Sequence, residues 1–236
     1  MSSPIVAAAV TPIVALDVPN AEQALMLVER LGERCRFYKV GSELFTGAGP
    51  DIVARLVDRG SDVFLDLKLH DIPNTVRGGA RAAARLGARL LTVHASGGRA
   101  VLEAAREAAG DGCGVLAVTV LTSMDAAELG AVWGREVVVV GDEVERLAAV
   151  AYESGVHGVV CGGQEAERVA RRFGDQLAVL VPGVRLPGGA VHDQSRVVTP
   201  REAARAGARY VVVGRAVTAA TDPTSAMDVV LAELAS

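Results

Sequence analysis

Asp66, Lys68 and Asp71 stand close together in residues 64–75, which read Phe-Leu-Asp-Leu-Lys-Leu-His-Asp-Ile-Pro-Asn-Thr. The apolar residues before and between them predict a buried strand. Because strand side chains alternate between two faces, we expect Asp66 and Lys68 to point the same way, about 7 Å apart. Pro73 blocks extension of the strand, so Asp71 falls in the loop that follows.

Charged groups at the end of a buried strand are costly to hold and need an explanation. One explanation is structural: a buried Asp–Lys ion pair that closes a layer of a barrel. The other is chemical, because carboxylates placed around an ammonium tune its pKa and the local field. The third charge, Asp71, favours the chemical interpretation.

Lysine is rare in this chain. Of its 24 basic residues, 22 are arginine, and Lys39 and Lys68 are the two lysines. A lysine carries a compact charge and a transferable proton, whereas a guanidinium is effectively never deprotonated. Both lysines fall at or near the ends of expected strands, so we expect both to do work that arginine cannot.

Short Val, Ile and Leu runs alternate with Ala-rich amphipathic segments along the whole chain. Strands are expected at 13–16, 37–40, 63–67, 90–93, 114–120, 158–160, 178–181 and 210–213. Helices are expected at 21–31, 51–59, 75–86, 99–108, 142–154, 165–173, 200–206 and 223–234. Eight β/α units without a break in composition predict the α/β class, a (β/α)₈ TIM barrel with residues 1–236 as a single domain. Segment 130–141 matches no pattern.

Composition excludes several classes of function. The net charge of −4, without a Lys/Arg block, argues against a nucleic-acid partner. The apolar runs are far too short to span a membrane, and residues 1–10 lack the basic start of a signal peptide. Cys35, Cys113 and Cys161 share no ligand-like spacing and are expected to fill the core in a reducing compartment. We therefore expect a soluble cytoplasmic protein.

In barrels of this kind, the C-terminal ends of the strands face the active site. Polar residues are expected at the ends of most of these strands. They are Asp17, Lys39, Asp66, Lys68, Asp71, His94, Thr122, Ser123, Arg185, Gly214 and Arg215.

The last two strands commonly form the phosphate end of such barrels. Gly214 lets the backbone approach an anion, and Arg215 can hold two of its oxygens. The stretch 182–194 is long for a loop after a strand and contains Arg185 and Gln194. We expect it to be a lid that folds over a phosphate, with Gln194 donating its amide.

Metal and cofactor sites are not expected. No cluster has zinc-ligand spacing, and neither Gly-x-Gly-x-x-Gly nor a P-loop occurs. The aspartates at the strand ends could hold Mg²⁺, but the two lysines among them would repel it. His94 is expected to be a histidine at the barrel mouth with its hydrogen bonds satisfied, and not a catalytic residue. Trp133 is expected to be a packing residue.

Residues 64–75 closely resemble the signature of the orotidine 5′-phosphate decarboxylase family. The resemblance continues through residues 15–17, 39–41, 118–123, 182–185, 193–194 and 214–218 and covers nearly the whole chain. It implies a homodimeric (β/α)₈ barrel that uses neither metal nor organic cofactor. The implied reaction converts orotidine 5′-phosphate to uridine 5′-phosphate, the last step of de novo UMP synthesis.

The resemblance also implies roles for residues of the charged array. Asp66, Lys68 and Asp71 would form it, with a contribution from Lys39. The Lys68 ammonium would stabilise the carbanion at C6 and then protonate it. Asp71 and Ile72 would enter the active site of the neighbouring subunit.

The remaining implied contacts hold the substrate. Asp17 and Lys39 would bind the ribose hydroxyls, and Thr75 would also contact the substrate. Thr122 or Ser123 would meet the pyrimidine edge, and the sequence leaves both open. The phosphate would be bound and enclosed by Arg185, Gln194, Gly214 and Arg215.

Two other functions stay open at this point. Sister barrels that decarboxylate 3-keto-gulonate 6-phosphate, or synthesise hexulose phosphate, share Asp-x-Lys-x-x-Asp. They need Mg²⁺ and carry a carboxylate ligand where Lys39 stands. A non-catalytic nucleotide-binding barrel is the third possibility, and it predicts uridine-phosphate binding without turnover.

Overall fold

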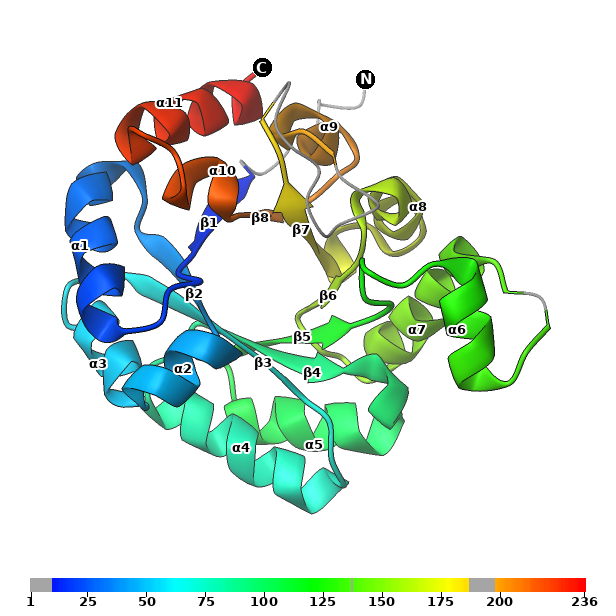
Figure 1. The fold of residues 1–236 in the computed structure, drawn as a ribbon. Coiled ribbons are helices and arrows are strands. Elements are labelled where there is room, and N and C mark those ends of the chain that lie inside the picture. Colours follow the sequence, from blue (N-terminus) through cyan, green and yellow to red (C-terminus); the bar gives the residue numbers. More distant parts are fainter. Residues whose placement is uncertain (1–9, 137, 187–197) are drawn as a thin grey trace, which may run out of the picture.

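The computed structural model describes residues 10–136, 138–186 and 198–236. Within these ranges, eight parallel strands close into a barrel in chain order (Figure 1). They are β1 (Thr11–Ala15), β2 (Phe37–Gly41), β3 (Asp62–Leu69), β4 (Leu90–His94), β5 (Gly114–Val118), β6 (Gly158–Val160), β7 (Ala178–Val184) and β8 (Tyr210–Val213). The prediction of a (β/α)₈ barrel is confirmed.

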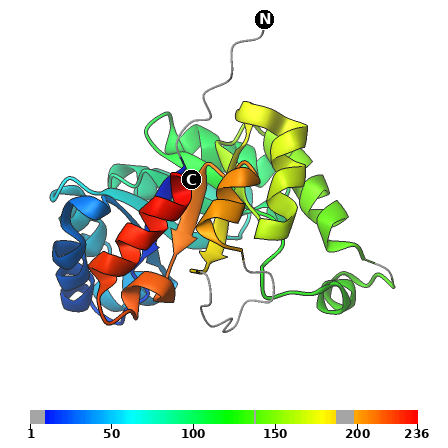
Figure 2. The ribbon, with the colours of Figure 1, turned by 90° about the horizontal axis from the view of Figure 1, so that it is seen from above.

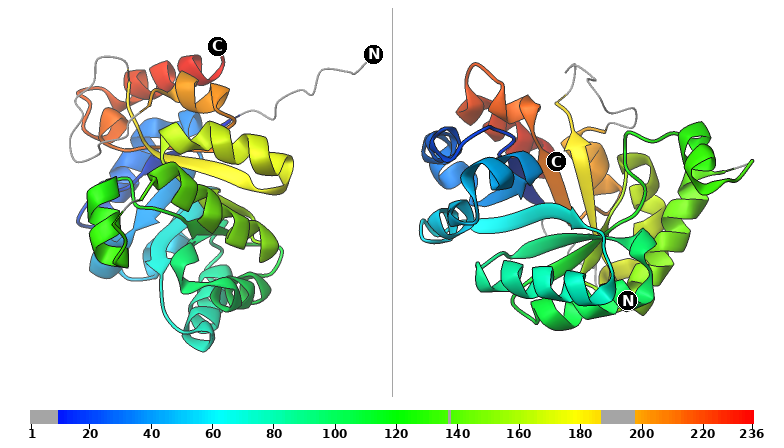
Figure 3. Two further views of the ribbon diagram at one scale, coloured as in Figure 1. Left: turned by 90° about the vertical axis from the view of Figure 1, so that its right-hand side faces the viewer. Right: turned by 60° about the horizontal axis from the view of Figure 1, so that its bottom comes forward.

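The helices cover the outside of the strands, as two further views show (Figure 3). They are α1 (Ala21–Leu31), α2 (Ser42–Ala48), α3 (Asp51–Val57), α4 (Pro73–Arg85), α5 (Arg99–Ala109), α6 (Ala126–Trp133), α7 (Val140–Glu153), α8 (Gly163–Phe173), α9 (Pro200–Arg205), α10 (Arg215–Thr218) and α11 (Pro223–Leu234). Short 3₁₀ turns lie at Gly32–Arg34, Ala95–Gly97 and Gly174–Gln176.

Two apolar cores follow from the alternation of the strand side chains. One fills the barrel and includes Phe37, Phe64, Leu90, Leu116 and Leu180. The other lies between the strands and the surrounding helices, and it takes the residues that alternate with the first set. The barrel interior is therefore filled by apolar side chains, and a site is expected at the C-terminal strand ends.

Three helices were not predicted: α2, α6 and α10, each at most eight residues long. Such short helices show too few turns for an apolar period to stand out. The fifth strand was predicted two residues too long, since it ends at Val118. There Thr119 leaves the regular ladder and bonds the carbonyl of Val160 with both its N–H and its hydroxyl.

Segment 130–141, which matched no sequence pattern, joins the end of α6 to the start of α7. Its turn uses Gly134 in the left-handed region, at φ 64°. Helix α6 lies at the edge of the molecule (Figures 1 and 2). The buried carboxylate of Glu143, on α7, accepts hydrogen bonds from Arg146 of the same helix and from Arg135 of the segment that follows α6. The Arg146 guanidinium also lies 5.6 Å from the ring centre of Trp133, which packs against the core.

The expectation that the three cysteines fill the core is confirmed. Cys35, Cys113 and Cys161 are all buried. None of the helices in the described ranges has the length and apolar character needed to cross a membrane.

Candidate active site

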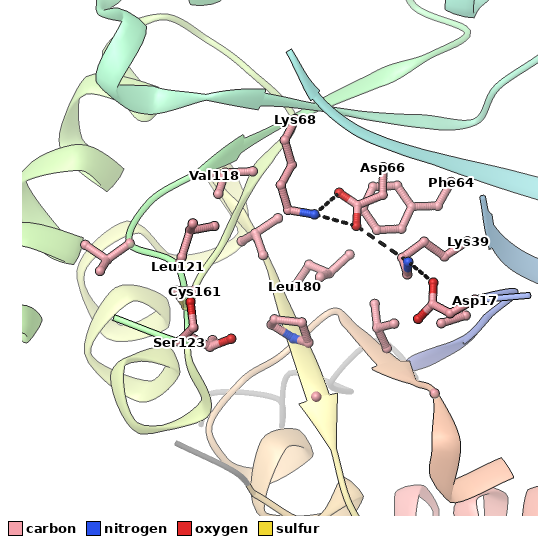
Figure 4. A pocket seen from close by; sticks show the side chains of 18 of the residues that line it. Asp17, Lys39, Phe64, Asp66, Lys68, Val118, Leu121, Ser123, Cys161 and Leu180 are labelled. Carbon is pink, nitrogen blue, oxygen red and sulfur yellow. Dashed lines mark hydrogen bonds and ion pairs between the residues drawn. The ribbon is translucent and has the colours of Figure 1, made fainter. Parts of the chain in front are cut away.

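Four charged side chains form a continuous row at the C-terminal ends of β1, β2 and β3 (Figure 4). Lys39 Nζ lies 2.8 Å from Asp17 Oδ1 and 3.7 Å from Asp66 Oδ2. Lys68 Nζ donates to both carboxylate oxygens of Asp66, at 2.9 and 2.8 Å. The row alternates in sign, Asp17–Lys39–Asp66–Lys68, so each interior member has an opposite charge on either side.

The members of the row differ in exposure. The side chains of Lys39 and Asp66 are each 12% exposed, whereas Lys68 is 40% exposed. A charge as buried as Asp66 is tolerated because two ammonium groups and a hydroxyl compensate it. The Lys68 ammonium, by contrast, retains an open side that faces the cavity.

The backbone at Lys68 departs from the regular strand that the sequence predicted. Its φ is 49°, and it is the one non-glycine residue in the described ranges with positive φ. The pairing of β3 with β4 shifts register between Leu65 and Leu69, around this residue. A lysine in the left-handed region costs about 1–2 kcal/mol. Both Asp66 and Lys68 still reach the same cavity, as predicted.

Thr92, on β4, contacts both members of this pair, and the sequence analysis missed it. Its hydroxyl accepts the backbone N–H of Lys68 and donates to Asp66 Oδ1, each at 2.9 Å. The residue is 0% exposed. The available signal was a single hydroxyl on the inward face of an apolar strand, between Leu90 and His94.

Gly41 explains part of the Lys39-Val-Gly motif. A Cβ at this position would stand 3.0 Å from Lys39 Nζ and 3.4 Å from Asp17 Oδ1. A side chain here would crowd the ion pair, and the Lys39 ammonium would have to shift to make room for it.

The row forms one wall of a cavity of about 390 Å³. The lining also includes the apolar side chains of Val118, Leu121 and Leu180, together with the thiol-bearing Cys161 (Figure 4). Thr122 and Ser123 line the same cavity from the segment after β5. A mostly apolar pocket with a few convergent polar groups is the usual form of a small-molecule site.

Two arginines and a glycine line the cavity beyond the last two strands. Arg185 directly follows β7 and is 9% exposed, and Gly214 and Arg215 directly follow β8. The expected lid begins later than predicted, because β7 continues through Val184. Gln194 and the rest of the expected lid from residue 187 onward lie outside the described residues.

Asp71, Ile72 and Thr75 do not line this cavity. All three are exposed, and Ile72 is 66% exposed. Asp71 Oδ1 accepts the N–H of Ile72 at 2.6 Å, and among the described residues no ion pair joins Asp71 to Lys68. Their predicted role in a neighbouring subunit remains a prediction.

His94, at the end of β4, lies beside the row without lining the cavity. Its ring is tilted against that of His70, with 5.1 Å between ring centres. Burial first, and then the electrostatic influence of His70 and Lys68, lower the pKa of His94. The neutral imidazole is thereby favoured. Within the described ranges, no group of three potential His, Cys, Asp or Glu ligands gathers around a possible metal position.

Comparison with known proteins adds independent findings. Residues 11–229 match the model of the "Orotidine 5′-phosphate decarboxylase / HUMPS family". Orotidine 5′-phosphate decarboxylase of Halorhodospira halophila is 50% identical over 230 residues, which cover 95% of each chain. That of Nitrosococcus oceani is 47% identical over 231 residues, covering 95% of this chain and 97% of the relative. The crystal structure of orotidine 5′-phosphate decarboxylase from Lactobacillus acidophilus superimposes with TM-score 0.85 at 36% identity, covering 97% of this chain and 100% of that one.

Proposed function

This chain belongs to the orotidine 5′-phosphate decarboxylase / HUMPS family, and from this membership we propose that it converts orotidine 5′-phosphate to uridine 5′-phosphate and CO₂. It is a decarboxylase, and therefore a lyase, of pyrimidine biosynthesis. The observation that carries the specific proposal is the row Asp17–Lys39–Asp66–Lys68, which places an accessible ammonium inside a nucleotide-sized cavity.

The cavity offers separate places for the three parts of the substrate. The phosphate would lie at Arg185, Gly214 and Arg215, with Gln194 closing over it. The ribose hydroxyls would meet Asp17 and Lys39, which are already paired at 2.8 Å. The pyrimidine would then lie between Lys68 and the segment that carries Thr122 and Ser123.

The reaction breaks the bond between C6 and the carboxylate carbon, and the electron pair of that bond remains on C6. This pair lies in the plane of the ring, so the π system cannot delocalise it. We assign its stabilisation to the Lys68 ammonium, which then transfers a proton to C6. Solvent reprotonates Lys68 after the product leaves.

Asp66 would keep the Lys68 ammonium charged and aimed. Its carboxylate contacts Lys68 through both oxygens, and Lys39 lies on its other side. The row of two carboxylates and two ammonium groups is neutral overall, and Lys68 would form its positive end next to the developing carbanion. Fixed charges in a site that excludes water act more strongly than they would in solution.

One ammonium cannot supply the whole rate enhancement, since enzymes lower barriers by roughly 8–23 kcal/mol. Binding energy from the phosphate, which does not react, can be used to close and dry the site. This gives Arg185, Gln194, Gly214 and Arg215 a part in the rate as well as in binding.

We further propose a cytoplasmic homodimer in which Asp71, Ile72 and Thr75 of one subunit complete the site of the other. In support, these residues are exposed and lie away from their own cavity. Mixing Lys68→Ala and Asp71→Ala proteins should restore activity if sites are shared. One of the two sites in a mixed dimer then holds both Lys68 from one subunit and Asp71 from the other. Activity no higher than the sum of the separate variants would contradict shared sites.

The sister reactions on sugar phosphates are the second candidate. The position where those enzymes carry a carboxylate ligand holds Lys39 here, and its ammonium fills the space between Asp17 and Asp66. A metal-dependent reaction would thus have to displace or replace a cation. Neither metal nor organic cofactor forms part of our proposal.

The test follows the orotate-ring absorbance as purified protein acts on orotidine 5′-phosphate, with and without EDTA. We expect loss of absorbance and formation of uridine 5′-phosphate at equal rates in both conditions. Loss of activity in EDTA would favour the sister reactions. Tight uridine 5′-phosphate binding without turnover would favour the non-catalytic barrel.

A further inference from the structure

The buried hydroxyl of Thr92 makes hydrogen bonds to both Asp66 and Lys68, the proposed catalytic pair, as an acceptor to one and a donor to the other. It accepts from the Lys68 backbone and donates to the Asp66 side chain, each at 2.9 Å. Thr92 comes from β4, whereas Asp66 and Lys68 both belong to β3. The contact therefore joins two neighbouring strands of the barrel at the place where their pairing loses its regular register.

The direction of these hydrogen bonds is fixed by chemistry. A backbone N–H can only donate, so Thr92 Oγ1 must accept from Lys68. The single hydroxyl proton is then left for Asp66, whose Oδ1 must accept it. A hydrogen bond of this kind suits the ionised carboxylate, the form that pairs with the Lys68 ammonium.

The same hydroxyl compensates an unfavourable backbone. At φ 49°, the Lys68 N–H is turned out of the regular ladder, and an unpaired buried N–H would cost about 1–3 kcal/mol. Thr92 takes up that N–H, so the left-handed conformation at Lys68 persists. This conformation directs the Lys68 side chain back toward Asp66 and the cavity (Figure 4).

We infer that Thr92 is a positioning residue of the reaction: it sets both the Asp66 carboxylate and the Lys68 backbone, and thereby the direction of the Lys68 ammonium. It does not line the cavity, and it acts through the pair. This inference rests on the proposed function for its kinetic expression, but the geometry it asserts can be measured without turnover.

Thr92→Val is the decisive variant, because valine has nearly the same shape but no hydroxyl. We expect kcat to fall about 10- to 100-fold, the effect of losing a hydrogen bond to a charged group. KM and the Kd of uridine 5′-phosphate should change less than about 3-fold, since the proposed phosphate and ribose contacts come from other strands. Thr92→Ser, which keeps the hydroxyl, should recover kcat to within about 3-fold of wild type.

Three outcomes would overturn the inference. They are a kcat of Thr92→Val within 2-fold of wild type, equal loss in Thr92→Ser and Thr92→Val, and loss of product binding in parallel with kcat. Thr92→Ala is a second hydroxyl-free variant for use if valine prevents folding, because it places no methyl group against Asp66.

Crystal structures of wild type and Thr92→Val separate this inference from the proposed function. In the variant, Lys68 should leave the left-handed region or its Nζ should move beyond 4 Å from Asp66. An unchanged Lys68 would overturn the positioning role even in an active enzyme. A wild-type protein without turnover would overturn the proposed reaction, while the structural comparison would still decide the role of Thr92.

Discussion

On the β1–β3 side of the cavity, charged side chains from neighbouring strand ends contact one another directly. On the β5–β8 side, the polar residues Thr122, Ser123, Arg185 and Arg215 stand on segments that follow the strands. Strand ends in a closed barrel are fixed by hydrogen bonds on both sides, whereas segments beyond them have more freedom. The difference teaches that the charges proposed to act on the reacting bond and on the ribose are set in advance. The proposed phosphate and pyrimidine contacts belong to the adaptable part of the site.

Removing the Lys68 ammonium tests the comparison of the two sides most strongly. Lys68→Ala should lower kcat by at least about 10⁴-fold, since both the electrostatic stabilisation and the proton donor are lost. Binding of uridine 5′-phosphate, measured by calorimetry, should remain. Lys68→Arg should not restore the rate, because a guanidinium does not give up a proton. A Lys68→Arg protein with near wild-type kcat would contradict the assignment.

Substitution on the opposite side should act on binding. Arg215→Ala removes a guanidinium suited to holding phosphate, and we expect kcat/KM to fall about 100-fold, mainly through KM. Steady-state kinetics on orotidine 5′-phosphate would measure this. Orotidine, which lacks the phosphate, should react very slowly with wild type and equally slowly with the variant.

Arg205→Ala is the matched control, because Arg205 is an exposed arginine on α9 outside the cavity lining. It should leave kcat/KM unchanged. If phosphate-free orotidine reacted comparably well with wild type, the contribution of remote binding energy would have to be abandoned.

The smallest expected effect concerns the ion pairs of Glu143, on α7. Burial by itself would raise the pKa of Glu143, but hydrogen bonds from Arg146 and Arg135 outweigh it and hold that pKa below the ordinary 4.5. A lowered folded-state pKa stabilises the protein above pH 4.5, and this contribution disappears as the pH falls through the folded-state pKa.

Glu143→Gln should therefore lower the free energy of unfolding by about 1 kcal/mol at pH 7, with little difference from wild type in strong acid. Urea denaturation at a series of pH values would measure it. A difference that stayed constant down to strong acid would show that the carboxylate charge is not responsible.

The side chains that line the cavity could be predicted from the sequence on both sides of the site, but the groups that support them could not. Lys39, Asp66 and Lys68 could be placed because alternation and strand ends are local properties. Thr92 was missed, since its partners are 24 and 26 residues away and only the pairing of β3 with β4 brings them together. The structure of the 130–141 region could not be predicted either. Helix α6 is too short to show an apolar period, and the ion pairs of Glu143 appear only once the chain is folded.

The left-handed backbone at position 68 has a consequence for how this chain can change. Glycine or asparagine would adopt that conformation with less strain, yet neither carries an amine. Selection for a robust fold and selection for turnover therefore pull in opposite directions at one residue. A library of variants selected for thermal stability alone should lose the lysine at this position and yield stable proteins without decarboxylase activity.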